Sequence, residues 1–391
     1  MLEEGLKKRD ILKILENKLS KDYRYNSGHI LGSMCTAAHE FGREIYCKYV
    51  NKNLGDPGLF SGTAELEDDL VKEIGELYHG KDIIGSFTTG GSEANLIAVR
   101  VAKELRPDIN EPEMIVPVSA HMSFDKSAEL LGIKLRKAKL KENSKLDTEH
   151  FKSLINENTC LVVGIAGTTS LGLIDPIQEI GKMIENKEIF FHVDAAFGGF
   201  VLPFLKDLGF KIPEWDFNVD QVDSITSDPH KMGMNVIPSG GIFLRNKNII
   251  QKTGFEIPYL AGGNFKHLHI VGTRPGGPVI SFWALMKYLG MNGFKEILNK
   301  CMKNTYYLCD GINGIKGIKL VTEPVMNIVG ITTESGESIC ELDEELRKLD
   351  WMLGKFEDFN LIRIVIMPHI TKSHLTKFIK DLAYIVKKLG L

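Results

Sequence analysis

The chain has 391 residues, which is long enough for a large domain with a sizeable core and a smaller second domain. Its composition is 43% hydrophobic and 25% charged, with a formal net charge of −3 at pH 7. This balance is typical of a globular protein and lacks the basic excess of nucleic-acid-binding proteins, so we expect no nucleic acid partner.

Targeting and metal-binding patterns are missing from the sequence. The first twenty residues mix both signs of charge with apolar positions, and no run of about 18 apolar residues follows, so we expect neither a secretory signal nor a membrane span. The six cysteines are scattered without a CxxC pair, and the histidines show no HExxH motif. These patterns predict reduced thiols, a cytoplasmic location and no metal.

The first predicted element is an amphipathic helix over residues 6–19. Its apolar side chains recur at helical spacing, so this helix should pack on another part of the protein. These side chains are Leu6, Ile11, Leu12, Leu15 and Leu19. We assign residues 1–50 to an N-terminal helical segment.

Short apolar runs then alternate with helical stretches as far as residue 244. Continuous apolar strands separated by helices indicate a mostly parallel sheet covered on both faces, and hence an α/β fold. Ligands of such sheets bind beyond the carboxyl ends of the strands. The predicted strands are 83–88, 114–118, 160–167, 189–194, 222–226 and 240–244, and the predicted helices are 92–105, 123–132 and 176–186.

The remaining third of the chain predicts a smaller α+β domain. A long helical region over 279–313 leads into it, and a final helix begins near residue 372. Between them lie predicted strands at 326–332 and 361–367 and a charged helix at 337–349. We therefore predict a large cofactor-binding domain over 51–290 and a small C-terminal domain over 291–391.

Two predicted strand ends carry groups suited to an anionic, ring-containing ligand. The sequence TTGGSEAN, residues 88–95, follows a strand and opens a helix, where glycines let backbone N–H groups approach an anion. A Gly-Gly turn before a helix is equally common as a purely structural turn. The sequence HVDAAFGG places Asp194 at the end of a buried strand, where a carboxylate needs a cationic partner unless it only caps a helix.

A third strand end carries a lysine. The sequence TSDPHKMG, residues 226–233, places Lys231 directly after an apolar run. Such a lysine is costly to desolvate, so it is either a surface residue with a buried stem or a functional amine. With an anion cradle, a buried acid and the imidazole of His121 at one sheet edge, the set matches the needs of pyridoxal phosphate. Lys231 would bind the aldehyde, Asp194 would keep the ring nitrogen protonated, and His121 would stack on the ring.

The motifs TTGGSEAN, AHMSF, GTTSLGLIDPI, HVDAAFGG and DPHKMG occur in an order that resembles the group II pyridoxal-phosphate decarboxylases. This family includes glutamate, aromatic-amino-acid and tyrosine decarboxylases, and the resemblance covers almost the whole chain. It is strongest to the compact archaeal tyrosine/aspartate branch, whose GSM and NLGDPGLF stretches correspond to residues 32–34 and 53–60. The motifs are specific as a set, although each alone is weak.

The resemblance implies a homodimer with the aspartate aminotransferase fold (fold type I) and assigns roles to individual residues. It makes Lys231 the Schiff-base lysine, Asp194 the partner of the ring nitrogen and His121 the stacking imidazole. Position within strand 361–367 would equally permit Arg363 to be an exposed strand residue. The further implied contacts are Gly91, Ser92 and His230 at the phosphate, Thr273 at the phosphate of the neighbouring subunit, Thr168 and Ala196 along the ring, and Arg363 at the substrate carboxylate.

The implied activity is that of a carboxy-lyase acting on an L-amino acid. The resemblance favours L-tyrosine, giving tyramine for methanofuran, or L-aspartate, giving β-alanine for coenzyme A, with L-glutamate as a third choice. Larger relatives carry a mobile loop whose tyrosine donates the final proton, whereas residues 261–271 here contain none. This departure leaves Tyr259, His267 and His269 as candidates for the proton donor.

Two rival functions fit parts of the pattern. One is a phosphate-substrate lyase or a cysteine desulfurase on the same fold, which for the desulfurase requires a catalytic cysteine on a small-domain loop. Cys340 instead falls in a predicted helix. The other rival is a silent homologue that binds the cofactor without catalysis, although binding alone places no demand on Lys231, Asp194 and His121 together.

Overall fold

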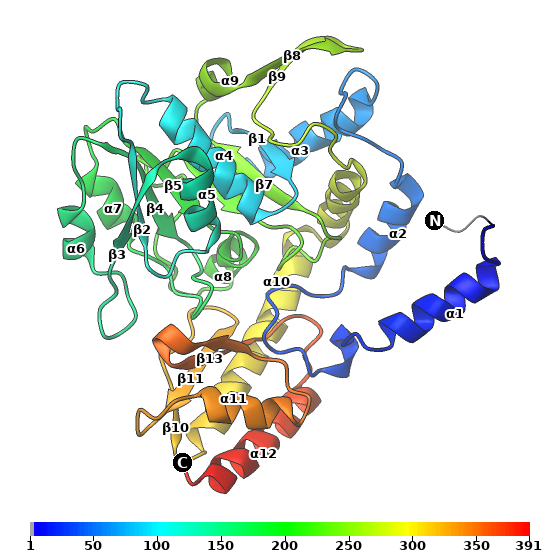
Figure 1. Ribbon diagram of the computed structural model, residues 1–391, viewed down its shortest axis with the longest axis vertical. Helices are drawn as coiled ribbons and strands as arrows, with labels where there is room; N and C mark the ends of the chain where they lie inside the picture. The colour runs from blue at the N-terminus through cyan, green and yellow to red at the C-terminus, as the bar shows by residue number, and fades with distance from the viewer. Residues whose placement is uncertain (1–3) are drawn as a thin grey trace.

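The computed structural model describes residues 4–391 (Figure 1). A large domain holds the central sheet, a smaller C-terminal domain lies below it in this view, and α10 (Gly277–Asn313) runs between them. No helix within the described range is long and apolar enough to span a membrane.

The large domain is built on a sheet with the strand order β1-β7-β6-β5-β4-β2-β3. Strand β7 is antiparallel to both of its neighbours, whereas the other pairings are parallel. The mostly parallel sheet predicted from the sequence is therefore confirmed. The strands are β1 (Ile84–Thr88), β2 (Glu113–Pro117), β3 (Lys134–Ala138), β4 (Thr159–Ile165), β5 (Phe190–Asp194), β6 (Ser224–Ser227) and β7 (Gly240–Leu244).

Burial on both faces of the sheet explains why its central strands read as unbroken apolar runs. Every residue of β2, β4 and β5 is buried. Neighbouring residues of one strand enter different cores, because Ile115 packs in one cluster and Met114 in another. Each such side chain contributes about 1.5 to 3 kcal/mol by leaving water. The covering helices are α3 (Ser61–Leu77), α4 (Gly91–Glu104), α5 (Ser123–Leu131), α6 (Thr148–Ser153), α7 (Ile177–Met183), α8 (Leu202–Asp207) and α9 (Asn248–Thr253).

Strand β3 and the hairpin of β8 (Phe255–Leu260) and β9 (Gly263–His267) were not predicted from the sequence. Strand β3 forms one edge of the sheet, three of its five residues are charged, and its burial is only partial. The hairpin is still more exposed and projects from the body beside α9 (Figure 1). Edge strands can remain exposed because one side faces water, so burial does not impose an apolar pattern on them.

The small domain is a four-stranded antiparallel sheet packed against helices. Its order is β10-β11-β13-β12, and residues Leu308 to Val386 supply most of its own apolar core. Helix α10 departs from helical geometry at Gly290, where φ is 54°, and the helix bends there before it leaves the large domain, since Phe294 after the bend still stacks on Phe204 of α8. The elements are β10 (Ile318–Leu320), β11 (Ile328–Thr333), α11 (Cys340–Arg347), β12 (Gly354–Phe356), β13 (Leu361–Val365) and α12 (Lys372–Leu389).

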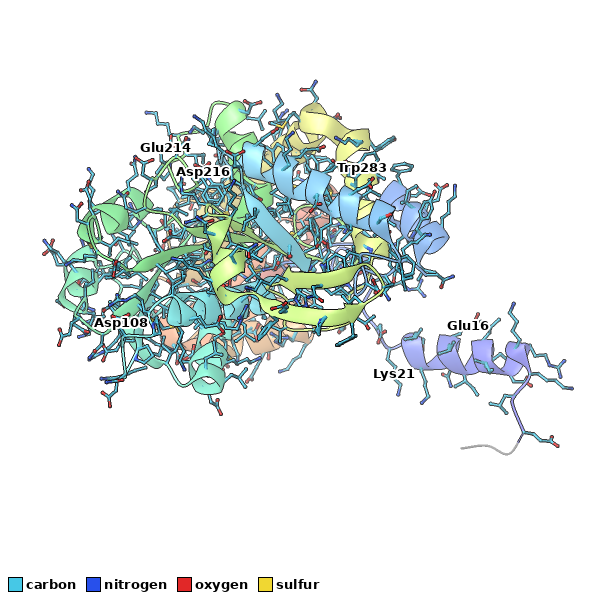
Figure 2. All side chains as sticks on the ribbon, turned by 90° about the horizontal axis from the view of Figure 1, so that it is seen from above. Glu16, Lys21, Asp108, Glu214, Asp216 and Trp283 are labelled. Carbon is cyan, nitrogen blue, oxygen red and sulfur yellow. The ribbon has the colours of Figure 1, made fainter. Side chains whose placement is uncertain are left out.

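The N-terminal segment does not form one unit. Helix α1 (Lys8–Leu19) forms as predicted, yet none of its residues is buried, and it points away from the body (Figures 1 and 2). Its predicted packing partner is thus not found within the described chain. Further on, the backbone N–H of Leu31 donates to Met352 O at 3.0 Å, which joins this stretch to the small domain. Helix α2 (Glu40–Tyr49) packs along α10.

Candidate active site

The carboxyl ends of β4, β5 and β6 meet the first turn of α4 around one cavity of about 330 Å³. Lys231, Asp194 and His121, which lie far apart in the sequence, all line this cavity. Parallel strands deliver their carboxyl ends to one sheet edge, which is why these three positions converge. A volume of this size suits a small cofactor with part of a substrate.

Lys231 follows β6 and faces a carboxylate that the sequence reading did not single out. Its Nζ lies 3.1 Å from Oδ2 of Asp228, a residue that is 2% exposed. Burial acts to lower the pKa of Lys231, but the carboxylates of Asp228 and Asp194 outweigh it, so this pKa is raised. The lysine is therefore a cation at neutral pH. The sequence signal was an acidic residue three positions before the lysine in DPHK.

Backbone N–H groups line the cavity where α4 begins. Gly91 and Ser92 open this helix, and the first N–H groups of a helix have no partner within it, so they attract an anion. A side chain at Gly91 would come within 3.0 Å of Asp228 Oδ2. Glycine is thus needed there for α4 to approach the strand ends. Glu93 closes the turn, since its Oε2 accepts from the Thr89 N–H and hydroxyl, both at 2.8 Å.

Two protein donors fix the carboxylate of Asp194, which is 5% exposed at the end of β5. Its Oδ1 accepts from the Ala196 N–H at 3.0 Å, and its Oδ2 accepts from Asn95 Nδ2 at 2.9 Å. The carboxylate plane is held by both oxygens, which leaves its remaining lone pairs for a group in the cavity. Ala196 lines the cavity beside it.

The two histidines at the cavity differ in burial. His121 sits at the rim, where its Nδ1 accepts from the Ser123 N–H at 3.2 Å. The side chain of His230 is only 13% exposed, and burial lowers its pKa, although Asp228 opposes this. His230 is therefore uncharged at neutral pH, and its Nε2 lies 3.6 Å from Asp228 Oδ2.

Three buried polar atoms at this cavity have no hydrogen-bond partner within residues 4–391. They are Glu93 Oε1, Asp228 Oδ1 and His230 Nδ1. An unpaired buried polar atom costs about 1 to 3 kcal/mol, so three of them around one cavity indicate that a polar ligand belongs there. A cation-forming amine, an acid, an imidazole and a helix N-terminus are the groups that pyridoxal phosphate requires, so the donor set fits this cofactor.

Three of the predicted site residues do not line the cavity. The Thr168 hydroxyl accepts from the Leu173 N–H at 3.0 Å inside a turn, and its neighbours Gly167 and Thr169 line the wall instead. Thr273 is exposed outside the cavity. Arg363 lies one layer behind the wall.

Arg363 is a buried cation without a carboxylate partner in the described chain. Its Nη1 donates to Thr169 O at 2.7 Å and its Nη2 to Gly32 O, while Nε has no partner. The residue is 8% exposed, and burial lowers its pKa to about 10, so it stays charged at neutral pH. Gly354 makes room for it, because a side chain there would meet the guanidinium at 3.0 Å.

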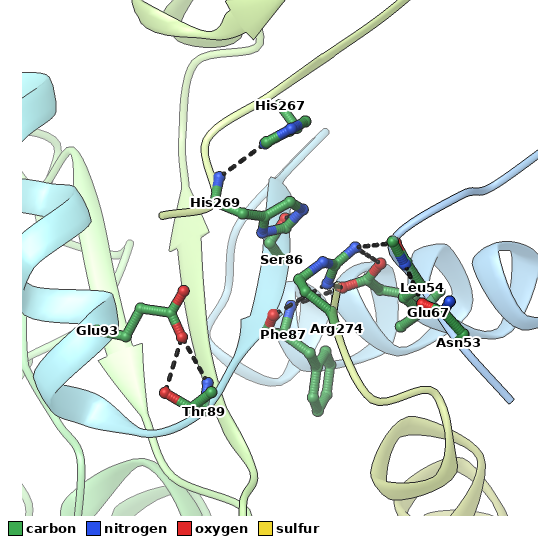
Figure 3. A network of polar contacts seen from close by, with 11 residues as sticks. Asn53, Leu54, Glu67, Ser86, Phe87, Thr89, Glu93, His267, His269 and Arg274 are labelled. Atoms are coloured by element: carbon green, nitrogen blue, oxygen red, sulfur yellow. Dashed lines mark hydrogen bonds and ion pairs between the residues drawn. The ribbon is translucent and has the colours of Figure 1, made fainter. Parts of the chain in front are cut away.

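A buried ion pair on the other side of β1 anchors the loop that carries Thr273 (Figure 3). Arg274 Nη1 lies 2.6 Å from Glu67 Oε1, which also accepts from the Phe87 N–H at 2.8 Å. The Leu54 N–H donates back to Arg274 O at 2.8 Å. This clamp holds Thr273 at the protein surface.

The three candidate proton donors also lie outside the cavity. Tyr259 is 82% exposed on the β8-β9 hairpin. His269 is 7% exposed beside Ser86, with its ring stacked on that of His267 at 4.8 Å (Figure 3). In this arrangement none of the three can donate a proton to a ligand in the cavity of its own chain.

Several cavity residues were missed by the sequence reading. Met34 arrives from the N-terminal segment, and Ile165 and Phe197 provide apolar wall. No local pattern marks an isolated apolar residue as part of a site. Asn95, by contrast, closes the quoted motif TTGGSEAN, and its position one turn into a helix was an available signal.

Comparison with known proteins points in one direction. The model of the "Pyridoxal-dependent decarboxylase conserved domain" matches residues 34–333. An L-aspartate/L-glutamate decarboxylase of Pyrococcus horikoshii is 43% identical over 378 residues, which is 97% of each chain. A probable L-tyrosine/L-aspartate decarboxylase of Methanothermobacter thermautotrophicus is 44% identical over 358 residues, covering 92% of this chain and 97% of that protein.

A solved structure shares the fold. The sphingosine-1-phosphate lyase of Burkholderia pseudomallei superposes with a TM-score of 0.91 at 24% identity, covering 99% of this chain and 92% of that one. The predicted fold, a fold type I α/β architecture with a large and a small domain, is thereby confirmed.

Proposed function

Because the chain belongs to the pyridoxal-dependent decarboxylase family and is a pyridoxal-phosphate-dependent carboxy-lyase, we propose that it removes carbon dioxide from L-aspartate, L-tyrosine or both. The family resemblance read from the motifs is confirmed by these relatives. The observation that carries the proposal is the convergence of Lys231, Asp194 and His121 on one cavity with three unpaired polar atoms.

Each part of the cofactor has a matching group in the cavity. Lys231 would bond its aldehyde, and Asp194 would pair with its ring nitrogen. The first turn of α4, with Gly91 and Ser92, would receive the phosphate, and His230 would add a hydrogen bond beside it. When bound, pyridoxal phosphate supplies an electron sink for the electron pair left by departing carbon dioxide.

The protein's own contribution to the reaction is placement of the substrate and of charge. Arg363, which lies behind the Thr169 wall, would receive the substrate α-carboxylate by exchanging the contact of its Nη1 with Thr169 O for the carboxylate. Asp228 would accept the Lys231 ammonium whenever that amine is released, since the two lie 3.1 Å apart. Apolar walls from Met34 and Phe197 would exclude water from the carboxylate that leaves.

The choice between substrates depends on the far end of the pocket. L-Aspartate needs a second cation, and L-tyrosine needs an aromatic slot with a polar end. The names of the relatives support aspartate most directly, with tyrosine and glutamate as alternatives. A desulfurase is not supported, because Cys340 begins α11 in the small domain and does not line the cavity.

We also propose that the enzyme works as a homodimer in the cytoplasm. Thr273 and Tyr259 are exposed away from their own cavity, so the contact that the resemblance gives to Thr273 would be made in a second copy. The uncovered apolar side chains of α1 and an open groove of about 520 Å³ between α2, α3 and α10 supply surface for that copy. The six free cysteines suit a reducing compartment. Light scattering of the purified protein should give twice the chain mass, and a monomer at micromolar concentration would refute the dimer.

The test of the activity uses the cofactor-loaded protein with each of the twenty amino acids, reading carbon dioxide and the amine together. We expect β-alanine from aspartate, tyramine from tyrosine, or both. The Lys231→Ala variant should lose the visible absorbance of the bound cofactor and nearly all turnover. Turnover of neither amino acid, or an unchanged yellow Lys231→Ala protein, would overturn the proposal.

A further inference from the structure

A histidine without a role in the steps above lies completely buried behind the cavity. His192 is on β5 two residues before Asp194, so both side chains point to the same face of the sheet. Its exposed fraction is 0%. One side chain separates its ring from the carboxylate of Asp194, and that side chain belongs to Asn95 on α4.

These residues form a continuous row of hydrogen bonds. Asn95 Nδ2 donates to Asp194 Oδ2 at 2.9 Å and to Ser123 Oγ at 3.0 Å. Asn95 Oδ1 lies 3.1 Å from His192 Nε2, and His192 Nδ1 lies 2.7 Å from Ser224 Oγ. A second hydroxyl, that of Thr226 on β6, lies 3.3 Å from Nε2. Every member is buried, so the row is shielded from competing water.

The carboxylate sets the direction of the whole row. An ionised carboxylate only accepts, so Asn95 must present its amide NH2 to Asp194 and its oxygen to His192. That oxygen accepts from the Nε2–H of His192, and Nδ1 then accepts from the hydroxyl of Ser224. Burial lowers the pKa of His192 to about 4, with Asp194 opposing it, so the ring has one proton and no charge.

We propose that Asn95 and His192 are positioning residues that hold the Asp194 carboxylate toward the ring nitrogen of pyridoxal phosphate. The inference rests on the contact between Asp194 and that nitrogen in the proposed function. A neutral donor favours the charged form of a carboxylate without cancelling its charge, whereas a protonated histidine beside it would compete with the ring nitrogen. The row thus directs the negative charge of Asp194 at the cofactor.

The test loads the enzyme with pyridoxal phosphate labelled with ¹⁵N in the ring and follows the protonation of that nitrogen by NMR as pH rises. In Asn95→Ala, the nitrogen should lose its proton at least about one pH unit lower than in the parent protein. The cofactor dissociation constant should rise about tenfold, because one hydrogen bond to a charged group is lost. Neither readout requires turnover.

The chain offers a matched control at the opposite sheet edge. Asn156 Nδ2 donates to the buried carboxylate of Glu113 at 2.8 Å, as Asn95 does to Asp194. Asn156→Ala removes the same kind of donor from a carboxylate far from the cavity. It should leave the ¹⁵N signal and the cofactor affinity unchanged.

An isosteric variant separates positioning from packing. Asn95→Asp keeps the side-chain volume, but the new carboxyl can donate to Asp194 only while it is protonated. The cofactor dissociation constant should therefore be near the parental value at low pH and should increase as pH rises, because the ionised carboxyl repels Asp194 instead of holding it in place. This pH profile would not follow from a merely structural role. If Asn95→Ala does not fold, the isosteric variant decides.

The two proposals fail in distinguishable ways. If both folded Asn95 variants keep the parental ¹⁵N signal and cofactor affinity while Asp194→Asn changes them, the positioning role is wrong and the role of Asp194 stands. If Asp194→Asn also leaves the ring nitrogen unchanged, the proposed contact of Asp194 is wrong, and this inference falls with it.

Discussion

Buried carboxylates are paired differently at the two ends of the strands of the central sheet. We call the ends where the strands begin the amino edge and the ends where they finish the carboxyl edge. At the amino edge, Glu113 begins β2 and is 2% exposed, yet both of its oxygens are paired with Arg136, Lys134 and Asn156. At the carboxyl edge, Asp228 is equally buried, but one of its oxygens has no partner in the described chain. The sheet therefore carries a satisfied cluster at the start of β2 and an unsatisfied cluster after the end of β6.

This difference separates stability from function. The Arg136 guanidinium holds the pKa of Glu113 down to about 2 against the effect of burial, with Asn156 and Lys134 adding to it. A group whose ionised form is so well paired supports the fold. Unpaired atoms at the cavity cost stability instead, and they persist where a ligand completes them.

The largest effect should follow from Asp194→Asn. Loss of the charge facing the cofactor ring should lower kcat about a thousandfold, or about 4 kcal/mol, while the melting temperature changes little. Steady-state assays and thermal melts measure both. Glu113→Gln is the matched control, because it removes a buried charge at the other edge and should keep kcat. If kcat falls in the control, or if Asp194→Asn keeps full activity, the assignment of catalysis to the carboxyl edge and of stability to the amino edge is wrong.

A smaller loss is expected from Arg363→Met. Without this cation the substrate α-carboxylate has no charged partner, so kcat/KM should fall about a hundredfold, or about 3 kcal/mol. Arg363→Lys should recover only part of the loss, because lysine cannot form the same planar pair of hydrogen bonds. Arg136→Met, which removes an arginine at the amino edge, should leave kcat/KM unchanged. Equal losses in both arginine variants would show that Arg363 acts through stability alone.

Glu113→Gln should reduce the free energy of unfolding by about 2 kcal/mol at neutral pH, since it removes the charged acceptor shared by three donors. The folded pKa of Glu113 lies below its usual value, so its contribution is present above about pH 4.5 and is lost as pH falls toward 2. Denaturant unfolding at neutral and acid pH should show the difference between variant and parent shrinking with acid. A constant difference across pH would contradict the ion-pair origin.

The smallest expected effect is a gain in the free energy of unfolding rather than a loss. Asp175 is 4% exposed near the cavity, and its Oδ2 accepts from the Ile165 N–H at 2.8 Å. Burial raises its pKa to about 7, with that hydrogen bond opposing. The folded protein therefore holds this proton more tightly than the unfolded chain, so stability declines as pH rises from about 4 to 7.

Asp175→Asn should remove this decline. We expect the variant to be more stable than the parent by about 1 kcal/mol near pH 8 and equal to it near pH 4. Denaturant unfolding of the variant and the parent at the two pH values measures this difference. A variant that is less stable at both would show that Asp175 is ionised and paired in the folded state.

Local patterns in the sequence predict the elements that are buried. The unbroken apolar run of 160–165 predicts a strand buried on both faces, and β4 is that strand. The glycines before α4 predict a helix N-terminus open to an anion. Strand β3 and the β8-β9 hairpin were not predicted, because these largely exposed strands are held by hydrogen bonds to a neighbouring strand rather than by burial.

By itself, the sequence determined six of the seven strands of the central sheet, the parallel α/β class and the three strand-end residues Lys231, Asp194 and His121, because apolar runs and chain order are local properties. Only the tertiary structure decided which groups surround them. The contacts of Asn95 with Asp194 and with His192 depend on how α4 packs against β5, which lies about a hundred residues further along the chain. Side-chain pairing across such separations is set by the packed core, and no pattern along the chain encodes it.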